Sequence, residues 1–196
     1  MSDILIKLLR PLEWINARLT GLGSLLGALA LALMVLVILT QVFCRYALNN
    51  ALPWPEEAAR FLMLWMTGLA APAVYRRGGF VAIDMLEAAL PRRAAAALAL
   101  ALLVISALVL AMALQFGWKH VNSGWLFNAA SLWVPLDLLG MAAIRVKLAW
   151  MYMSIFLGFA LLMAVNAELI LRSLIQLGGG GDRLTTIPST VMAEAE

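Results

Sequence analysis

Residues 21–44 read GLGSLLGALALALMVLVILTQVFC, a run without a single charged side chain. As an α-helix rising about 1.5 Å per residue, this run is longer than the ~30 Å hydrocarbon core of a bilayer. The whole chain has the same character, since 64% of its residues are hydrophobic and 13% are charged. A soluble domain has about a quarter of its residues charged. The sequence therefore predicts an all-α integral membrane protein whose first transmembrane helix covers 21–44.

Three further spans are predicted from the gaps between charged residues, because charges are costly at the bilayer centre. Two of these gaps predict spans at 94–117 and 148–171. The uncharged residues 61–75 would form a helix of only about 22 Å, which is too short to cross the core. A span at 55–75 is long enough, and Pro55 is well suited to a first helical position. Four transmembrane helices are expected.

The residues outside these spans predict the domain organisation. Residues 1–177 are expected to form one four-helix transmembrane domain, and the glycine-rich, polar residues 178–196 a flexible C-terminal tail. Residues 126–144 are apolar on average but contain Pro135 and Asp137. We interpret them as an interfacial helix or a re-entrant piece. A fifth span is the less favoured alternative, because it would place Asp137 near mid-membrane.

The distribution of Lys and Arg predicts the orientation, since these residues are enriched in cytoplasmic loops. With four spans, five of the 14 basic residues fall on the side that receives Arg45 and Arg60. The other nine fall on the side of both chain termini: Lys7, Arg10, Arg18, Arg76, Arg77, Arg92, Arg93, Arg172 and Arg183. Both termini are therefore predicted to be cytoplasmic, and the N-terminal segment is expected to be retained as part of the first span.

The most polar candidate cluster lies between the first and second spans. Glu56 and Arg60 are four residues apart and can form an ion pair on one helix face. Arg45 leaves the first span on the same side and could meet Glu57, while Trp54 suits the interfacial aromatic belt. One interpretation is a cluster that carries an ion or a substrate. The favoured one is a set of ion pairs that fixes the first hairpin and a partner surface.

A short amphipathic helix is predicted at the cytoplasmic surface between the second and third spans, at residues 80–90. Asp84 and Glu87 share a narrow stripe of this helix, next to an apolar side. Arginines at 76, 77, 92 and 93 flank it and could touch anionic lipid headgroups. Both lipid anchoring and docking onto a partner are consistent with this pattern.

No pattern in the sequence supports catalysis. There is no nucleophile–base spacing, phosphate-binding loop or metal-ligand spacing, and Cys44 and His120 are the only residues of their types. No cofactor, no metal, no enzymatic activity and no nucleic-acid partner is expected. Glu168 is expected to pair with Arg172, one helical turn further on. The third span has few polar residues, which is typical of a lipid-facing or scaffold helix.

Several short motifs follow one another in an order that resembles a known family. They are FCRY at 43–46, WPEEAAR at 54–60, RRGG at 76–79, VAIDML at 81–86 and GFAL at 158–161. This order is similar to that of the small membrane subunit of tripartite ATP-independent periplasmic (TRAP) transporters, the DctQ-like family. One departure is Phe80, where the family commonly has a histidine four residues before Asp84.

The resemblance implies a function that the residues alone do not. A subunit of this kind is an accessory scaffold in the bacterial inner membrane, beside a large TRAP membrane subunit that moves substrate and sodium. A periplasmic substrate-binding protein delivers organic acids to the pair. Trp54, Glu56, Glu57 and Arg60 would then stabilise the first hairpin and shape the periplasmic docking surface. Small residues would allow close packing against the large subunit: Gly23, Gly27, Ala28, Gly68 and Ala71.

Two alternatives differ in what they require of the sequence. An independent small channel or transporter would need polar residues repeated at mid-depth along a helix face. A membrane-embedded enzyme acting on lipid would need a buried set of catalytic groups. The polar residues gather at the span ends instead, which favours the accessory subunit.

Overall fold

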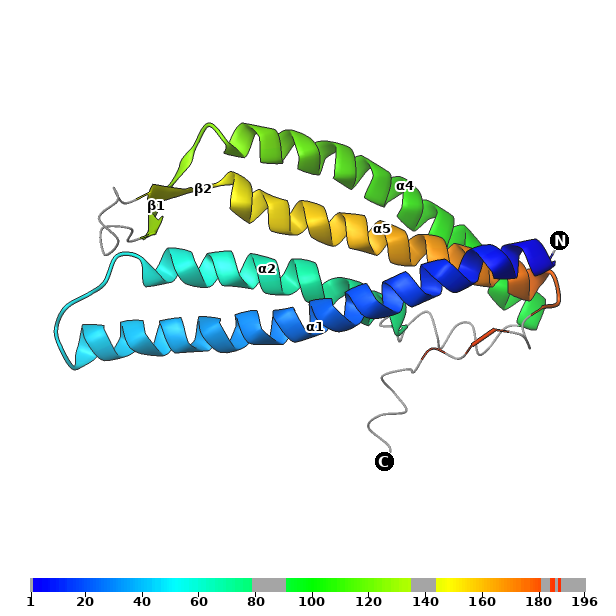
Figure 1. Cartoon of the computed structure of the whole chain (residues 1–196), viewed down its shortest axis with the longest axis horizontal. Coiled ribbons are helices and arrows are strands. Elements are labelled where there is room, and N and C mark those ends of the chain that lie inside the picture. The colour runs from blue at the N-terminus through cyan, green and yellow to red at the C-terminus, as the bar shows by residue number, and fades with distance from the viewer. Residues whose placement is uncertain (1, 79–90, 135–143, 181–183, 186, 188–196) are drawn as a thin grey trace, which may run out of the picture. The chain divides into compact units, whose positions relative to one another are not determined.

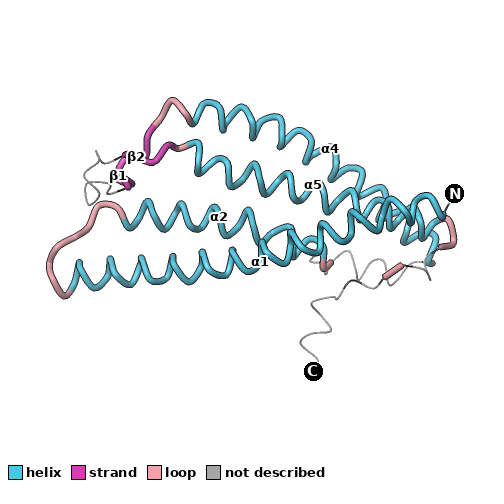
Figure 2. Tube along the Cα trace, viewed as in Figure 1, coloured by secondary structure: helices cyan, strands magenta, loops and turns pink. Residues whose placement is uncertain are grey.

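The structure is a computed structural model that describes residues 2–78, 91–134, 144–180, 184, 185 and 187. Helices make up most of the trace, and a small two-stranded sheet is the exception (Figures 1 and 2). Four of the described helices are long and apolar enough to cross a membrane, which confirms the four predicted spans. The elements are, in order, α1 (Ser2–Tyr46), α2 (Pro55–Arg76), α4 (Arg92–Gly124), β1 (Asn128–Val134), β2 (Ile144–Lys147) and α5 (Ala149–Leu177).

Helix α1 is much longer than the span predicted at 21–44. It begins at Ser2 and runs for 45 residues, about 67 Å at 1.5 Å per residue. The charge-free run marks only its membrane-crossing part, because the charge criterion cannot detect a helix that continues into the interfacial region. Pro11 lies inside the helix and has no N–H for the helical ladder. The first turns of α1 precede the charge-free run and carry charged side chains such as Arg10 and Glu13.

Helix α2 begins at Pro55, as predicted. The backbone N–H of Ala58 donates to the Trp54 carbonyl at 3.0 Å, so Trp54 is the N-cap residue and Pro55 the first helical residue. Proline has no N–H to leave unsatisfied at this position. Glu56 and Glu57 occupy the first turn, at the positive end of the helix dipole. With 22 residues, α2 is about 33 Å long, enough to cross the hydrocarbon core.

The described parts of 126–144 form strand rather than helix, so the interfacial-helix interpretation was wrong there. Strands β1 and β2 pair antiparallel, with Asn128 opposite Lys147 and Val134 opposite Ile144. The backbone N–H of Leu148 also donates to Phe127 O at 3.1 Å. In a hairpin, the backbone N–H and C=O groups are satisfied by hydrogen bonds between the strands. The mean hydropathy of a segment is the same for a hairpin and a helix, so it could not distinguish the two. Residues 135–143, which include Pro135 and Asp137, lie outside the described residues.

Helix α5 ends in a glycine cap. Gly179 has a φ of 78°, a left-handed conformation that glycine adopts without strain. The Gly180 N–H donates to Ile175 O at 2.9 Å and the Gly179 N–H to Gln176 O at 3.1 Å, the two bonds of a Schellman motif. The glycine run therefore stops α5 at Leu177, the residue before the predicted tail. The division into 1–177 and 178–196 stays a prediction.

The chain divides into two compact units. The first, called the terminal unit here, comprises 1–23, 71–113 and 159–196, and the second, the hairpin unit, comprises 24–70 and 114–158. Each unit contains one segment of every long helix. Each has its own polar site.

In the hairpin unit the helices pack through glycine. A Cβ added at Gly158 would lie 2.8 Å from the Gly68 Cα, and one added at Gly68 would overlap the carbonyl of Ser154. A Cβ at Gly27 would lie 3.2 Å from that of Ala70. Small residues thus bring α2 close to both α5 and α1. Gly27 and Gly68, predicted to pack against a partner, pack within this chain.

Candidate functional site: a buried charge cluster and a carboxylate clamp

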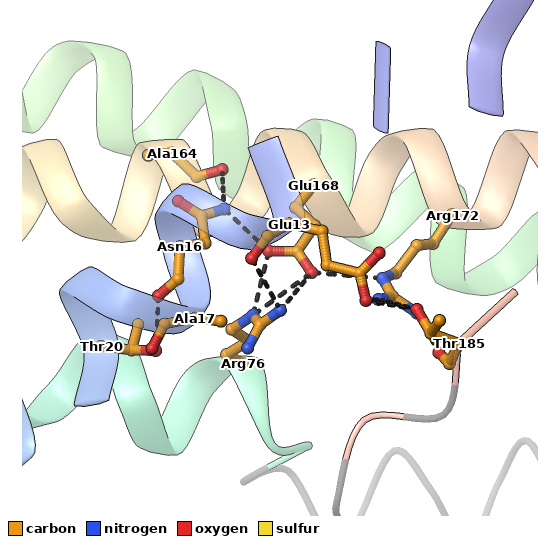
Figure 3. Close-up of polar contacts among 9 residues, drawn as sticks. All are labelled: Glu13, Asn16, Ala17, Thr20, Arg76, Ala164, Glu168, Arg172 and Thr185. Carbon is orange, nitrogen blue, oxygen red and sulfur yellow. Dashed lines mark hydrogen bonds and ion pairs between the residues drawn. The ribbon is translucent and has the colours of Figure 1, made fainter. Parts of the chain in front are cut away.

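Glu168 is the centre of the polar site in the terminal unit (Figure 3). Its side chain is fully buried, with 0% exposure. Arg76, the last residue of α2, donates to both carboxylate oxygens, with Nε at 3.0 Å from Oε2 and Nη2 at 2.9 Å from Oε1. Asn16 Nδ2 of α1 donates to Oε2 at 2.8 Å. Arg172 Nε completes the shell at 3.3 Å, which confirms the predicted pair with Glu168.

A second carboxylate extends the cluster toward the C-terminal residues. Arg172 Nη2 donates to Glu13 Oε1 at 2.8 Å, and its Nη1 donates to the carbonyl of Thr185 at 2.8 Å. The Thr185 hydroxyl also binds Glu13 Oε1. Arg172 therefore links α1, its own helix α5 and a residue that the sequence placed in the tail (Figure 3).

Asn166 connects the remaining helix. Its Nδ2 donates to the Leu103 carbonyl of α4 at 3.0 Å, and its Oδ1 accepts from the Tyr75 hydroxyl of α2 at 2.6 Å. Asn166 is itself fully buried. Together, Glu168 and Asn166 place hydrogen bonds between α5 and each of the other three long helices.

The charges in this cluster balance. The carboxylates of Glu13 and Glu168 face the guanidinium groups of Arg76 and Arg172, and the three ion pairs between them measure 2.8–3.3 Å. A buried charge is tolerated only when it is paired and hydrogen-bonded, and these four groups meet that condition. The arrangement can hold helices together, and its groups are all engaged with one another.

Sequence reasoning missed most of this cluster. It assigned Arg76 to lipid headgroups, whereas the Arg76 side chain is only 12% exposed and binds Glu168. Glu13 and Asn16 precede the predicted first span and were not singled out. One signal was present, since Glu13, Asn16 and Thr20 follow an i, i+3, i+7 spacing that places them on one helix face.

The polar site of the hairpin unit is a clamp formed by Glu57. Its Oε1 accepts the backbone N–H of Ala130 at 3.0 Å, and its Oε2 accepts the backbone N–H of Ser131 at 2.6 Å and the Ser131 hydroxyl at 2.7 Å. Glu57 is the third residue of α2, and its partners lie in β1, more than 70 residues away. The carboxylate therefore ties the start of α2 to the strand hairpin.

The other predicted residues near Glu57 take separate roles. Glu56 and Arg60 form the predicted ion pair, with both side chains 68% exposed. Arg45 was expected to meet Glu57, but within the described residues the two form no ion pair, because the Glu57 oxygens are engaged by β1. Trp54 is half-buried and supplies the carbonyl that begins α2. Asp84 and Glu87 lie outside the described residues, as does the predicted helix at 80–90.

Across the described ranges, no group of three or more His, Cys, Asp or Glu side chains is arranged to hold a metal ion.

The ring of His120 lies 5.9 Å from that of Tyr152, measured between centroids. Aromatic rings also meet at Trp125 and Trp150, where centroids are 6.1 Å apart.

Comparison with known proteins assigns the family. The DctQ component of the tripartite ATP-independent periplasmic transporters matches residues 34–176, well over half of the chain. The chain belongs to this family. One relative of this DctQ-family chain is the sialic acid TRAP transporter small permease protein SiaQ of Vibrio cholerae, which is 22% identical over 121 residues, covering 62% of this chain and 70% of the relative. The chain is thus a transporter subunit rather than an enzyme.

The family match contains most of both polar sites. Glu57, Arg76 and Glu168 lie within residues 34–176, whereas Glu13 and Asn16 precede the matched region. Membership implies assembly with a large membrane subunit and a periplasmic binding protein.

Proposed function

We propose that this chain is the accessory scaffold subunit of a TRAP transporter in the bacterial inner membrane. It packs beside a large membrane subunit that carries out sodium-coupled uptake of an organic acid, which a periplasmic binding protein delivers. The chain itself does not form the transport path. Its contribution is a four-helix support and a surface for docking.

The observation that carries this proposal is the closed charge cluster around Glu168. A group that carries a substrate or an ion must exchange its partners during transport. Glu168 is fully buried and already accepts hydrogen bonds from Asn16, Arg76 and Arg172. Because the Glu168 carboxylate is already bound by groups of this chain, it supports a structural role in which Glu168 fixes the helices to each other.

The apolar stripe of α4 in the terminal unit supports a membrane partner. Ile105, Leu108, Val109 and Met112 follow the i, i+3, i+4, i+7 spacing of one helix face, and all are 57–64% exposed. Among the described residues of this unit, no other segment covers the stripe enough to bury these side chains. We propose that the large subunit, rather than lipid, covers this stripe.

The excess of basic residues around the chain termini supports a cytoplasmic position for both. The first hairpin and the β1–β2 hairpin would then be periplasmic. We propose that the Glu57 clamp fixes the periplasmic surface on which the binding protein docks, and that Trp54, Glu56, Arg60 and Arg45 border this surface.

The experiment that tests the scaffold proposal is purification of the tagged chain from its native membranes in a mild detergent. A much larger polytopic protein should copurify at equal abundance. To locate the contact, Cys44, the chain's only cysteine, is replaced by serine and a single cysteine is introduced at Leu108. A crosslinker should then join position 108 to the large protein.

A matched cysteine at Leu126, which is 79% exposed in the hairpin unit, is the control for nonspecific crosslinking. If the chain purified alone and, in liposomes without any partner, moved solute across the membrane, the scaffold proposal would be wrong. That result would support the independent transporter instead.

A further inference from the structure

A cavity formed by described residues of the terminal unit has walls that are both cationic and aromatic. It has a volume of about 380 Å³, within the ~300–1,000 Å³ range of small-molecule sites. Its lining comes from α1, from the end of α2 and from the C-terminal residues: Arg10, Glu13, Trp14, Ala17, Arg76, Thr185 and Ile187. The cavity adjoins the charge cluster and shares Glu13, Arg76 and Thr185 with it, whereas Arg10, Trp14, Ala17 and Ile187 lie outside the hydrogen bonds described above.

The electrostatics of this cavity follow from which charges are already matched. Glu13 is paired with Arg172, and Arg76 with Glu168, so these walls contribute little net charge. Arg10 is different. Among the described residues its exposed guanidinium has no ion pair or hydrogen bond with an acidic group. The cavity therefore has an uncompensated positive charge and can accept an anion.

The face of α1 that leads to the cavity has the same character. Lys7, Arg10, Trp14 and Arg18 follow steps of three, four and four residues, which places them on one side of the helix. The Arg18 guanidinium lies 5.2 Å from the centre of the Trp14 ring, and Trp14 is 62% exposed. A basic stripe with an exposed tryptophan, directly before the apolar run at 21–44, is typical of a helix at the level of lipid headgroups.

We infer that this cavity binds the phosphate group of an anionic phospholipid. The Arg10 guanidinium donates to the phosphodiester oxygens, for which its fork geometry is well suited. The Trp14 ring and the apolar Ala17 and Ile187 contact the glycerol region. The acyl chains continue beside the apolar part of α1. This lipid site is independent of substrate transport and of the contact with the large subunit.

The test uses the full chain, with any copurifying subunit, delipidated in detergent and titrated with phosphatidylglycerol in native mass spectrometry. Phosphatidylcholine and inorganic phosphate are titrated in parallel. Arg10→Ala removes the uncompensated charge, and Lys7→Ala is the matched control, because it removes an equal charge from the same stripe without touching the cavity lining. Trp14→Leu is a second variant, which leaves the charge unchanged.

The wild-type chain and Lys7→Ala should hold one phosphatidylglycerol more tightly than phosphatidylcholine. Arg10→Ala should weaken its binding about tenfold or more, as expected for loss of a charge-assisted contact, and Trp14→Leu should weaken it less. Equal binding by Arg10→Ala and Lys7→Ala, or no preference between the two lipids, would overturn the inference. Inorganic phosphate that bound in an Arg10-dependent way while phosphatidylglycerol did not would overturn the lipid assignment and point to a soluble phosphate.

Discussion

Glu168 in the terminal unit and Glu57 in the hairpin unit are both helix carboxylates that bind distant segments, yet their partners differ in kind. Glu168 is fully buried and binds two guanidinium groups and an amide. Glu57 binds two backbone N–H groups and a hydroxyl, all neutral. A carboxylate removed from water needs opposite charge, whereas a half-buried one at a helix start is stabilised by dipoles. The first fixes helices to each other, and the second holds a surface hairpin.

The largest effect is expected from Glu168→Ala. This change removes the carboxylate that binds Arg76 and leaves Arg172 with Glu13 as its acidic partner, and removal of one partner from a buried ion pair costs about 3–5 kcal/mol. The purified chain is heated in detergent, and the fraction that stays monodisperse is measured at each temperature. The unfolding temperature of Glu168→Ala should be much lower than that of the wild type. In cells, the amount of protein in the membrane should fall.

The control for this prediction is the double variant Arg76→Met, Glu168→Met. Replacing both members of a buried pair by apolar residues is often much less costly than removing one, so it should be more stable than Glu168→Ala. If both variants lost stability equally, the charge balance around Glu168 would not explain the role of the cluster.

A somewhat smaller effect is expected from Gly158→Leu, which tests packing in the hairpin unit without any charge. A side chain at this position meets the Gly68 backbone at 2.8 Å, and overpacking typically costs about 1–3 kcal/mol. Gly21→Leu is the matched control, because a Cβ there meets no atom within 4 Å. Equal thermal stability of the two variants would show that the glycine contact is not tight.

The distance along the chain between contacting residues explains which features could be predicted from the sequence. Helix positions follow from local signals, such as the charge-free run at 21–44 and the helix start at Pro55. The Glu56–Arg60 and Glu168–Arg172 pairs were also predictable, because they lie one turn apart. The bond between Asn16 and Glu168 joins residues 152 positions apart, and no local pattern in one sequence determines such a pairing. Arg76 was misassigned for this reason, since an arginine at a span end fits a lipid headgroup equally well.

An intermediate and local effect is expected from Glu57→Ala. The backbone N–H groups of Ala130 and Ser131 lose their acceptor, so their hydrogen exchange should rise about tenfold, in line with a lost bond to a charged group. Unfolding temperature should change less than in Glu168→Ala. If the clamp shapes a docking surface, transport by the assembled complex should also fall, and unchanged assembly together with unchanged uptake would remove that role.

The smallest effect is expected from Glu56→Ala, the neighbour of Glu57 in sequence. Its ion pair with Arg60 is exposed on both sides, where water and salt screen the attraction and most pairs contribute little. Unfolding temperature and amide exchange in β1 should both equal those of the wild type. Glu56 and Glu57 carry the same charge in the same helical turn. Comparing the two variants therefore distinguishes the effect of the Glu57 hydrogen bonds from the effect of one negative charge at the helix start. Faster exchange at Ala130 in Glu56→Ala would mean that the charge of the first turn, rather than the Glu57 hydrogen bonds, holds the hairpin in place.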